Sequence, residues 1–404
     1  MDRRILTSTK ELNIIYCVIQ FLYWTGGCIA IGFAAAVLGE LGYTNSAIGV
    51  ISAVSSVIGF ALMLATSVYI DRKSGKAILA IMALAVSAQI LCLIPILRAK
   101  EPGMVVSVCY IIYLSLAHVL NNAVTKLYID LKYAGADIDF GIARGIGSLA
   151  FACTSAIAGS VMEQYSHSLI LISGQAAFLG SMIFCLSIKN KAGNNNQTVL
   201  SRKDREKPSS RGSFAGKYGL FILLTAGISL VSASNKTLTV FLVNIVKNVG
   251  GSMRSFGIIS GYLAFIEIPI TLMYSLIRKK FSVPFLLAAS LCFYTLKIAG
   301  YMLAGNTAML IAASSLQVFS TGIFQPSTVE YVRENIDHDQ TGVAQSMING
   351  MPLIFSCVFT AIFGVLLDGF SVSFLLPLVF AAATAGTAIS FACLIIGNRK
   401  QKDA

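Results

Sequence analysis

Charged residues are scarce in this sequence. They make up 12 % of its 404 residues, about half the share of an ordinary soluble chain. Hydrophobic residues make up 56 %, and the mean hydropathy is +0.77. This composition argues against a soluble protein of several domains and indicates a chain that crosses a membrane many times.

Patterns that mark common catalytic sites are also missing. The sequence has no Gly-x-Ser-x-Gly, no His-Glu-x-x-His and no phosphate-binding loop, and its polar segments are too short to form an ATPase domain. Its nine cysteines all fall in apolar runs without metal-ligand spacing, so we expect free thiols and no metal site. We predict that the protein is not an enzyme and needs no cofactor.

Long apolar runs dominate the sequence instead. A run of about 20 apolar residues can cross a bilayer as a helix. Twelve such runs are present, at residues 12–38, 46–70, 77–97, 104–131, 141–162, 168–188, 218–246, 256–277, 283–304, 306–331, 341–367 and 372–397. The predicted fold is therefore an all-α membrane protein with twelve transmembrane helices.

One polar stretch, residues 189–217, separates six runs from six. It is rich in Asn, Ser, Lys and Arg, which predicts a flexible linker between an N-terminal half, residues 1–188, and a C-terminal half, residues 218–404. The halves also share a local pattern. Gly141-Ile-Ala-Arg144 opens the fifth run and Gly342-Val-Ala-Gln345 opens the eleventh, as expected for parallel repeats.

The net charge of +12 lies mainly in the loops between runs. If the N-terminus is inside, cytoplasmic segments hold 22 of the 30 Lys and Arg residues and outside loops hold 4. Because basic residues accumulate on the cytoplasmic side, we expect both termini in the cytoplasm and the protein in the cell membrane. These loops favour contact with anionic lipid over nucleic acid, and we expect a monomer.

Polar side chains interrupt the apolar runs of the first half. His118, Asn122 and Lys126 lie on the fourth run, and Arg144 lies near the start of the fifth. A charge in the hydrocarbon region costs several kcal/mol unless it is paired or hydrated. Lys126 and Arg144 are therefore candidates for solute binding, and Asn122 is a further candidate beside them. Either cation could instead extend to the cytoplasmic interface. His118 could relay protons or only bond to a neighbouring helix.

The second half contains the only carboxylate near the middle of a run, Glu267. A carboxyl group in such surroundings can bind and release a proton as they change, so Glu267 is a candidate for proton coupling. Lys297 on the next run could take part, or could form a permanent ion pair with Glu267. Lys236 follows a polar patch that could line a solute cavity or lie near the outer end of a kinked span.

Uncharged side chains are further candidates for cavity lining. Trp24, beside two glycines, could stack on a solute ring or mark a membrane interface. The amide side chains of the tenth and eleventh runs are adaptable hydrogen-bonding groups; they are Gln317, Gln325, Gln345 and Asn349.

The loop after the second run resembles a signature of the major facilitator superfamily. That signature is G-x-x-x-D-R-x-G-R-[KR], and here the loop reads Ser67-Val-Tyr-Ile-Asp71-Arg72-Lys73-Ser-Gly75-Lys76, with one extra residue before the glycine. The resemblance implies a gating loop rather than a solute site, formed by Asp71, Arg72, Gly75 and Lys76.

The start of the fifth run is similar to the F-G-x-x-R-x-x-G segment of the lactose permease branch, which includes oligosaccharide and nucleoside symporters. Here it reads Phe140-Gly-Ile-Ala-Arg144-Gly-Ile-Gly147. The resemblance implies that Arg144 binds the solute and that Phe151, seven residues later, stacks on it. Branch members pair this arginine with a glutamate on the fourth helix, whereas the matching position here is Lys126, which cannot form that pair.

Two segments of the second half resemble the same branch. Glu267-Ile-Pro269 looks like its E-[IV]-P segment, and Lys297 occupies the place of an arginine that takes part in proton coupling. The resemblance implies two six-helix halves that work by alternating access, and proton-coupled symport of a small polar solute such as a sugar, a nucleoside or an organic anion. An antiporter that exports drugs or metabolites and a transport-inactive receptor or scaffold remain alternatives.

The sign of the solute's charge stays open. Lys126, Arg144, Lys236 and Lys297 lie within runs against the single carboxylate of Glu267, so a shared cavity could hold a net charge of up to +3. An anionic solute would compensate such an excess. The branch resemblance favours a neutral sugar or nucleoside.

Overall fold

The computed structural model describes residues 3–73, 76–133, 138–192, 214–337 and 340–402. Within these ranges the elements are helices, with no β-strand. Twelve of the described helices are long and apolar enough to cross a membrane. The prediction of an all-α membrane protein with twelve transmembrane helices is confirmed.

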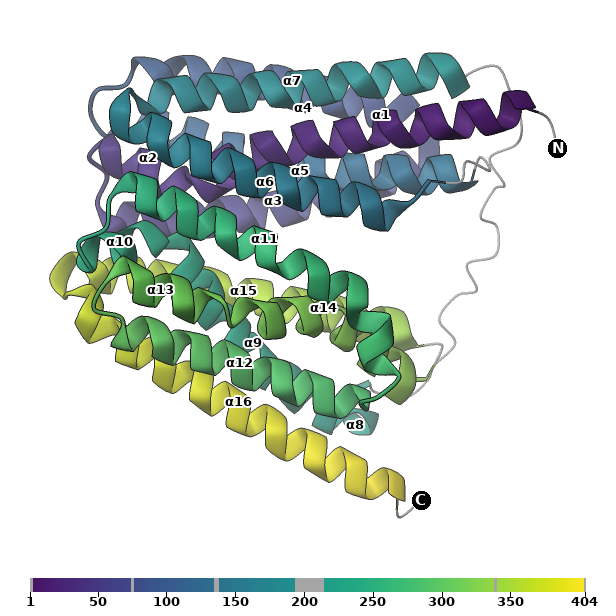
Figure 1. Ribbon diagram of the computed structural model, residues 1–404, viewed down its shortest axis with the longest axis vertical. Coiled ribbons are helices and arrows are strands. Elements are labelled where there is room, and N and C mark those ends of the chain that lie inside the picture. The colour runs from purple at the N-terminus through teal and green to yellow at the C-terminus, as the bar shows by residue number, and fades with distance from the viewer. Residues whose placement is uncertain (1–2, 74–75, 134–137, 193–213, 338–339, 403–404) are drawn as a thin grey trace. The chain divides into compact units, whose positions relative to one another are not determined.

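The helices follow one another along the chain as labelled in Figure 1. The first group comprises α1 (Arg3–Gly27), a π-helical turn η1 (Cys28–Gly32), α2 (Ala34–Glu40), α3 (Asn45–Lys73), α4 (Lys76–Arg98), α5 (Met104–Tyr133), α6 (Phe140–Gln164) and α7 (His167–Ala192). The second comprises α8 (Phe214–Lys217), α9 (Gly219–Val240), α10 (Leu242–Asn248), α11 (Met253–Arg278), α12 (Val283–Leu303), α13 (Thr307–Ser314), α14 (Gln317–Asn335), α15 (Thr341–Gly369) and α16 (Val372–Lys402).

Three predicted spans are interrupted rather than continuous. The run 12–38 passes through η1 into α2, 218–246 divides into α9 and α10, and 306–331 divides into α13 and α14. At the last break the Ser315 hydroxyl donates to the carbonyl of Ile311 at 3.2 Å, a local bond that competes with the helical ladder. An apolar count misses such breaks because the residues on both sides stay apolar.

The chain forms two compact units. Unit 1 consists of Met1–Thr44, Val54–Ser201 and Phe256–Phe265, and unit 2 of the remaining residues. Helices α3 and α11 therefore each contribute to both units. The prediction of halves at 1–188 and 218–404 stays a prediction, and most of the predicted linker lies outside the described residues.

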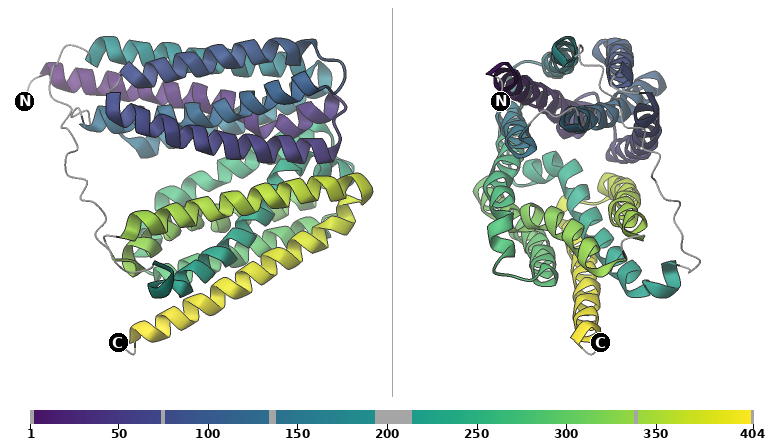
Figure 2. Two further views of the ribbon diagram at one scale, coloured as in Figure 1. Left: turned by 180° about the vertical axis from the view of Figure 1, so that it is seen from behind. Right: turned by 90° about the vertical axis from the view of Figure 1, so that its right-hand side faces the viewer.

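In unit 1, α1 packs against α5, α6 and α7, and α4 packs against α5 and α7. Helix α1 lies beside α6 and α7 in both ribbon views (Figures 1 and 2). The contact with α7 is close at Gly26, where an added Cβ would lie 2.7 Å from the Phe178 ring. This packing brings one face of α1 against the first turns of α6.

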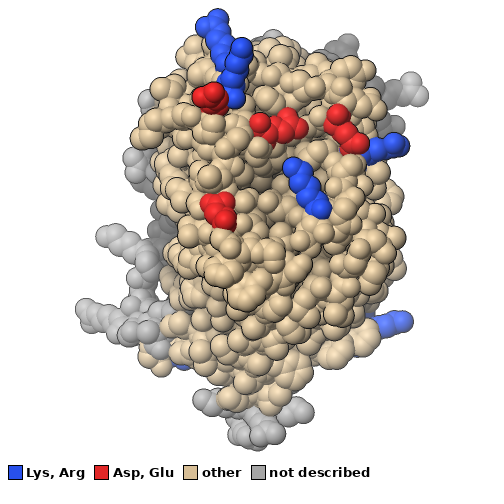
Figure 3. All heavy atoms as spheres, turned by 90° about the vertical axis from the view of Figure 1, so that its left-hand side faces the viewer, with Lys and Arg blue, Asp and Glu red and all other residues tan. Residues whose placement is uncertain are grey.

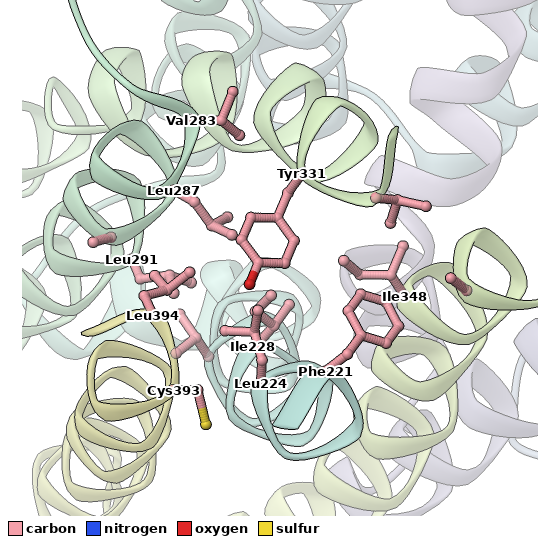
Figure 4. Close-up of a cluster of buried hydrophobic side chains, with 14 of the residues drawn as sticks. Phe221, Leu224, Ile228, Val283, Leu287, Leu291, Tyr331, Ile348, Cys393 and Leu394 are labelled. Carbon is pink, nitrogen blue, oxygen red and sulfur yellow. The ribbon is translucent and has the colours of Figure 1, made fainter. Parts of the chain in front are cut away.

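In unit 2, α9 packs against α12, α15 and α16, and α12 also packs against α14 and α16. Side chains from all five helices converge on one apolar cluster, shown in Figure 4. It includes Phe221, Leu224, Ile228, Leu287, Leu291, Tyr331, Ile348 and Leu394. The cluster packs α9, α12 and α14 together, and polar side chains of these three helices form part of the site described below.

The surface agrees with the low charge content. In Figure 3 only a few acidic and basic side chains interrupt a surface of uncharged residues. The predicted gating loop spans the end of α3, which contains Asp71 and Arg72, and the start of α4 at Lys76. Gly75 and the side chains of Asp71, Arg72 and Lys76 lie outside the described residues.

Candidate functional site

Lys297 is the most enclosed charged side chain in the described part of the chain, with 3 % of its surface exposed. It lies on α12, an apolar helix that begins with a proline in its first turn. Neighbouring positions on this face, Tyr294 and Tyr301, are also buried. A cation in such a place requires polar partners from the helices around it.

Two amide oxygens supply those partners. The Lys297 ammonium donates to Oε1 of Gln317 on α14 at 2.6 Å and to Oδ1 of Asn235 on α9. It also lies 5.5 Å from the ring centroid of Tyr294, one turn earlier on α12, within the range of a cation–π contact. The lysine is therefore held by neutral groups from α9 and α14.

Gln317 continues the chain of contacts to Glu267. Its amide Nε2 donates to Oε1 of Glu267 on α11. Lys297 and Glu267, which the sequence predicts as either a coupling pair or an ion pair, are thus connected through Gln317. Four helices contribute one side chain each to a continuous path, Asn235–Lys297–Gln317–Glu267, called here the amide-bridged chain.

From the sequence, Gln317 was predicted only to line a cavity. Asn235 belongs to the polar patch that precedes Lys236, and the sequence assigned it no partner. Both were visible as polar residues in apolar runs. Which of them meets Lys297 depends on how four helices pack, and sequence spacing does not contain that information. The coupling roles of Glu267 and Lys297 stay predictions.

Lys236 follows Asn235 on α9 but does not join the amide-bridged chain. Successive helical residues point about 100° apart, and Lys236 lies near Cys357 on α15. Thr237 also faces α15, where its hydroxyl lies 3.4 Å from that of Thr360. Among the described residues no carboxylate forms an ion pair with Lys236, which remains a half-buried cation on the α15 side of α9.

Gln345 and Asn349 lie four residues apart on α15, so they share one face of that helix. Gln345 is half-buried and Asn349 is exposed. The described hydrogen bonds of the amide-bridged chain involve neither side chain. Their solute role stays a prediction.

In unit 1, Arg144 lies in the second turn of α6. The Asp139 carboxylate starts this helix by accepting a hydrogen bond from the backbone of Ile142 at 3.0 Å. The guanidinium carbon of Arg144 lies 4.2 Å from the centroid of the Trp24 ring, and one of its nitrogens donates to the Ser148 hydroxyl at 2.7 Å. Arg144 is thus oriented by an aromatic face and a hydroxyl.

A ladder of side chains on α1 holds Trp24 in turn. The Trp24 indole donates to Gln20 at 3.0 Å, and Gln20 donates to the Tyr16 hydroxyl at 2.8 Å. Each residue is four positions from the next, so the three follow one side of α1, and the Tyr16 hydroxyl donates in turn to the carbonyl of Val124 on α5.

Gly147 explains how Trp24 approaches α6 so closely. A Cβ at this position would lie 2.3 Å from the Trp24 ring. Phe151, one turn later, meets Trp24 edge to face with ring centroids 6.3 Å apart. Three predicted solute residues, Trp24, Arg144 and Phe151, therefore come together; this group is called here the aromatic–arginine cluster.

The candidates on α5 contact α3 instead. Asn122 donates to the Ser67 hydroxyl at 3.0 Å and to the Met63 carbonyl at 3.3 Å. The His118 ring packs against Gly59, where an added Cβ would lie 2.8 Å from it. Lys126, one turn beyond Asn122, is half-buried. These contacts join α5 to α3, and the predicted roles in binding and proton relay stay predictions.

Comparison with known proteins gives one family. The model described as "MFS_1 like family" matches residues 13–378. No protein of curated function matched the sequence.

Several solved structures share the fold. The nucleoside transporter NupG superposes with a TM-score of 0.76 at 15 % identity, covering 96 % of this chain and 98 % of that one. The peptide transporter POT gives 0.73 at 12 %, covering 96 % and 94 %. A bacterial homologue of the iron transporter ferroportin gives 0.68 at 12 %, covering 98 % and 99 %. At these identities the likeness shows the fold alone.

Proposed function

Since this chain belongs to the MFS_1 like family, we propose that it is a secondary active transporter that moves a small polar solute across the cell membrane together with protons. Twelve apolar helices make it a multi-pass membrane protein, and the family match supports a transporter rather than an enzyme. In this proposal it works as a monomer by alternating access, with both termini in the cytoplasm.

The observation that carries proton coupling is the amide-bridged chain. It joins a half-buried carboxylate, Glu267, to the enclosed cation Lys297 through hydrogen bonds to one neutral amide. A group that changes charge within a membrane must be compensated as it does so, and a nearby lysine on a neutral bridge provides that compensation. Glu267 is the proposed proton carrier.

The aromatic–arginine cluster is the proposed core of the solute site. A guanidinium fixed by the Trp24 ring can donate to hydroxyl or carboxylate oxygens of a solute. Phe151 beside it offers a face on which a sugar or base ring can stack. A sugar, a nucleoside and an organic anion all fit this chemistry. Lys126, Lys236, Asn122, Gln345 and Asn349 are the proposed additional solute contacts.

A solute screen followed by a proton-flux measurement tests this proposal. Purified protein is first heated with sugars, nucleosides and carboxylates, since a ligand at 100 times its dissociation constant adds about 2.7 kcal/mol of stability. Each compound that raises the melting temperature is then added outside proteoliposomes that contain a pH-sensitive dye. We expect the lumen to acidify as the solute enters.

The other outcomes contradict the proposal in distinct ways. Uptake without acidification would exclude proton symport, and proton movement opposite to the solute would assign an antiporter. A protein that binds a solute but never moves it would be a receptor.

A further inference from the structure

Gln317 stands between the two charged groups of the amide-bridged chain, and its side chain has a fixed polarity there. It is 8 % exposed, accepts from Lys297 through Oε1 and donates to Glu267 through Nε2. An ammonium can only donate and a carboxylate can only accept, so both neighbours demand the same amide orientation. Reversing the amide would set its NH2 group against the ammonium.

We propose that Gln317 is a positioning residue that transmits the protonation state of Glu267 to Lys297. This inference rests on the proposed function in taking Glu267 as the proton carrier. It adds that the neutral amide strengthens the coupling of the two charges beyond their attraction through space. Gln317 exchanges no proton itself.

The argument follows from the strengths of the two hydrogen bonds. When Glu267 is ionised, its bond from Nε2 is charge-assisted and roughly twice as strong as a neutral one. That bond polarises the amide and makes Oε1 a better acceptor for Lys297, since hydrogen bonds in series strengthen one another in low dielectric. When Glu267 takes up a proton, both effects are lost. Lys297 is then held mainly by Asn235.

The same chemistry explains why neither a carboxylate nor an apolar side chain can replace this amide. A glutamate at position 317 could accept from Lys297 but would face Glu267 with a second carboxylate. A methionine of similar size could do neither. Both changes keep much of the side-chain volume, so they separate hydrogen bonding from packing.

The test is a mutant cycle read by thermal unfolding of the purified protein without solute. Glu267→Gln and Lys297→Met are made singly and together, first in the natural background and then with Gln317→Met. We expect the two changes to be non-additive in melting temperature in the natural background, and clearly less so with Gln317→Met. The matched control is Gln164→Met, an exposed glutamine at the end of α6, which leaves the non-additivity intact.

Non-additivity of unchanged size with Gln317→Met would overturn the inference, because attraction through space would then account for all of the coupling between Glu267 and Lys297. If the Gln317→Met proteins do not fold, the cycle is repeated with Gln317→Glu, where non-additivity of unchanged size contradicts the inference. In transport, Gln317→Met should move the pH midpoint of uptake upward by about one unit or more, while Gln164→Met leaves it in place. The unfolding cycle needs no transport, so a failed symport proposal and a failed bridge are distinguishable.

Discussion

The two units hold their enclosed cations in different ways. In unit 2, Lys297 lies between the oxygens of Gln317 and Asn235 and is almost fully buried. In unit 1, Arg144 is half-buried and lies over the face of the Trp24 ring. An ammonium that donates to two amides is engaged with the protein itself. A guanidinium that stacks on an aromatic ring is held by its flat face. Its N–H groups point outward in the plane, along its edges.

This contrast suggests a division of labour. The amide-bridged chain suits internal charge compensation, because its polar atoms are hydrogen-bonded to one another. The aromatic–arginine cluster suits recognition, because a planar donor and two aromatic rings lie together in it. The predictions below change one side of the comparison at a time.

The largest effect is expected from Lys297→Met. The change leaves the buried amide oxygen of Gln317 without its donor, at about 1–3 kcal/mol, and removes a donor from half-buried Asn235 and the cation from Glu267. We expect a clearly lower melting temperature and no coupled uptake. Lys247→Met, at an exposed position on α10, is the matched control and should behave as the natural protein. An unchanged melting temperature for Lys297→Met would show that the lysine is not held as described.

Arg144→Lys should leave stability nearly intact and weaken solute binding. Lysine keeps the charge but loses the planar contact with Trp24 and the fork of donors. One lost charge-assisted hydrogen bond costs about 1.5–3 kcal/mol, so affinity should fall about tenfold to a hundredfold. Binding is measured with the solute found in the screen, and exposed Arg98→Lys serves as the control. Equal affinity for both variants would remove Arg144 from the solute site.

Gly147→Ala should disturb the aromatic–arginine cluster more mildly. The new Cβ would lie 2.3 Å from Trp24, so the ring must shift from beneath Arg144. Trp24 is the single tryptophan of the sequence, so its fluorescence reports the shift directly. We expect an altered emission maximum and a several-fold loss of affinity. Gly39→Ala, whose Cβ meets no atom within 4 Å, should change neither; identical spectra for both variants would contradict the described contact.

The smallest effect is expected at an exposed ion pair, Lys217 with Asp337, where the side chains are 58 % and 60 % exposed. The hydrogen bond from Lys217 lowers the pKa of Asp337 below its usual value of about 3.9. The stabilisation is therefore complete above about pH 4 and is lost as the pH falls through the lowered pKa. Water and salt screen such a pair.

Asp337→Asn should consequently change the melting temperature only slightly at pH 7, and less still in 1 M salt. Lys217→Gln should do the same. A large decrease that salt does not reduce would place this pair with the buried cations and weaken the contrast drawn above.

The sequence was sufficient for the twelve spans and for single charged residues, because an apolar run and a charge within it are both local features. It gave Glu267, Lys297, Arg144 and Trp24 as candidates, with Lys297 as a possible partner of Glu267. It did not identify the bridge by Gln317, because an amide in a helix is unremarkable until packing gives it two charged neighbours. The contact of Trp24 with Arg144 likewise depends on the close approach of two helices.

The sequence did not predict the breaks inside three of the spans, and the reason is related. Hydropathy continues through η1 and past Ser315, while the helical hydrogen bonds do not. Local bonding of small and hydroxyl-bearing residues decides such points, and its outcome depends on the surrounding helices.

The most direct test of the central claim compares two transport modes of Glu267→Gln. Proteoliposomes are assayed for solute accumulation driven by a pH gradient and for exchange of labelled against unlabelled solute at equal concentrations. If Glu267 carries the proton, the variant loses accumulation and retains exchange, because glutamine imitates the protonated side chain and allows the loaded carrier to reorient. Accumulation that continues in the variant at the natural rate would contradict the account.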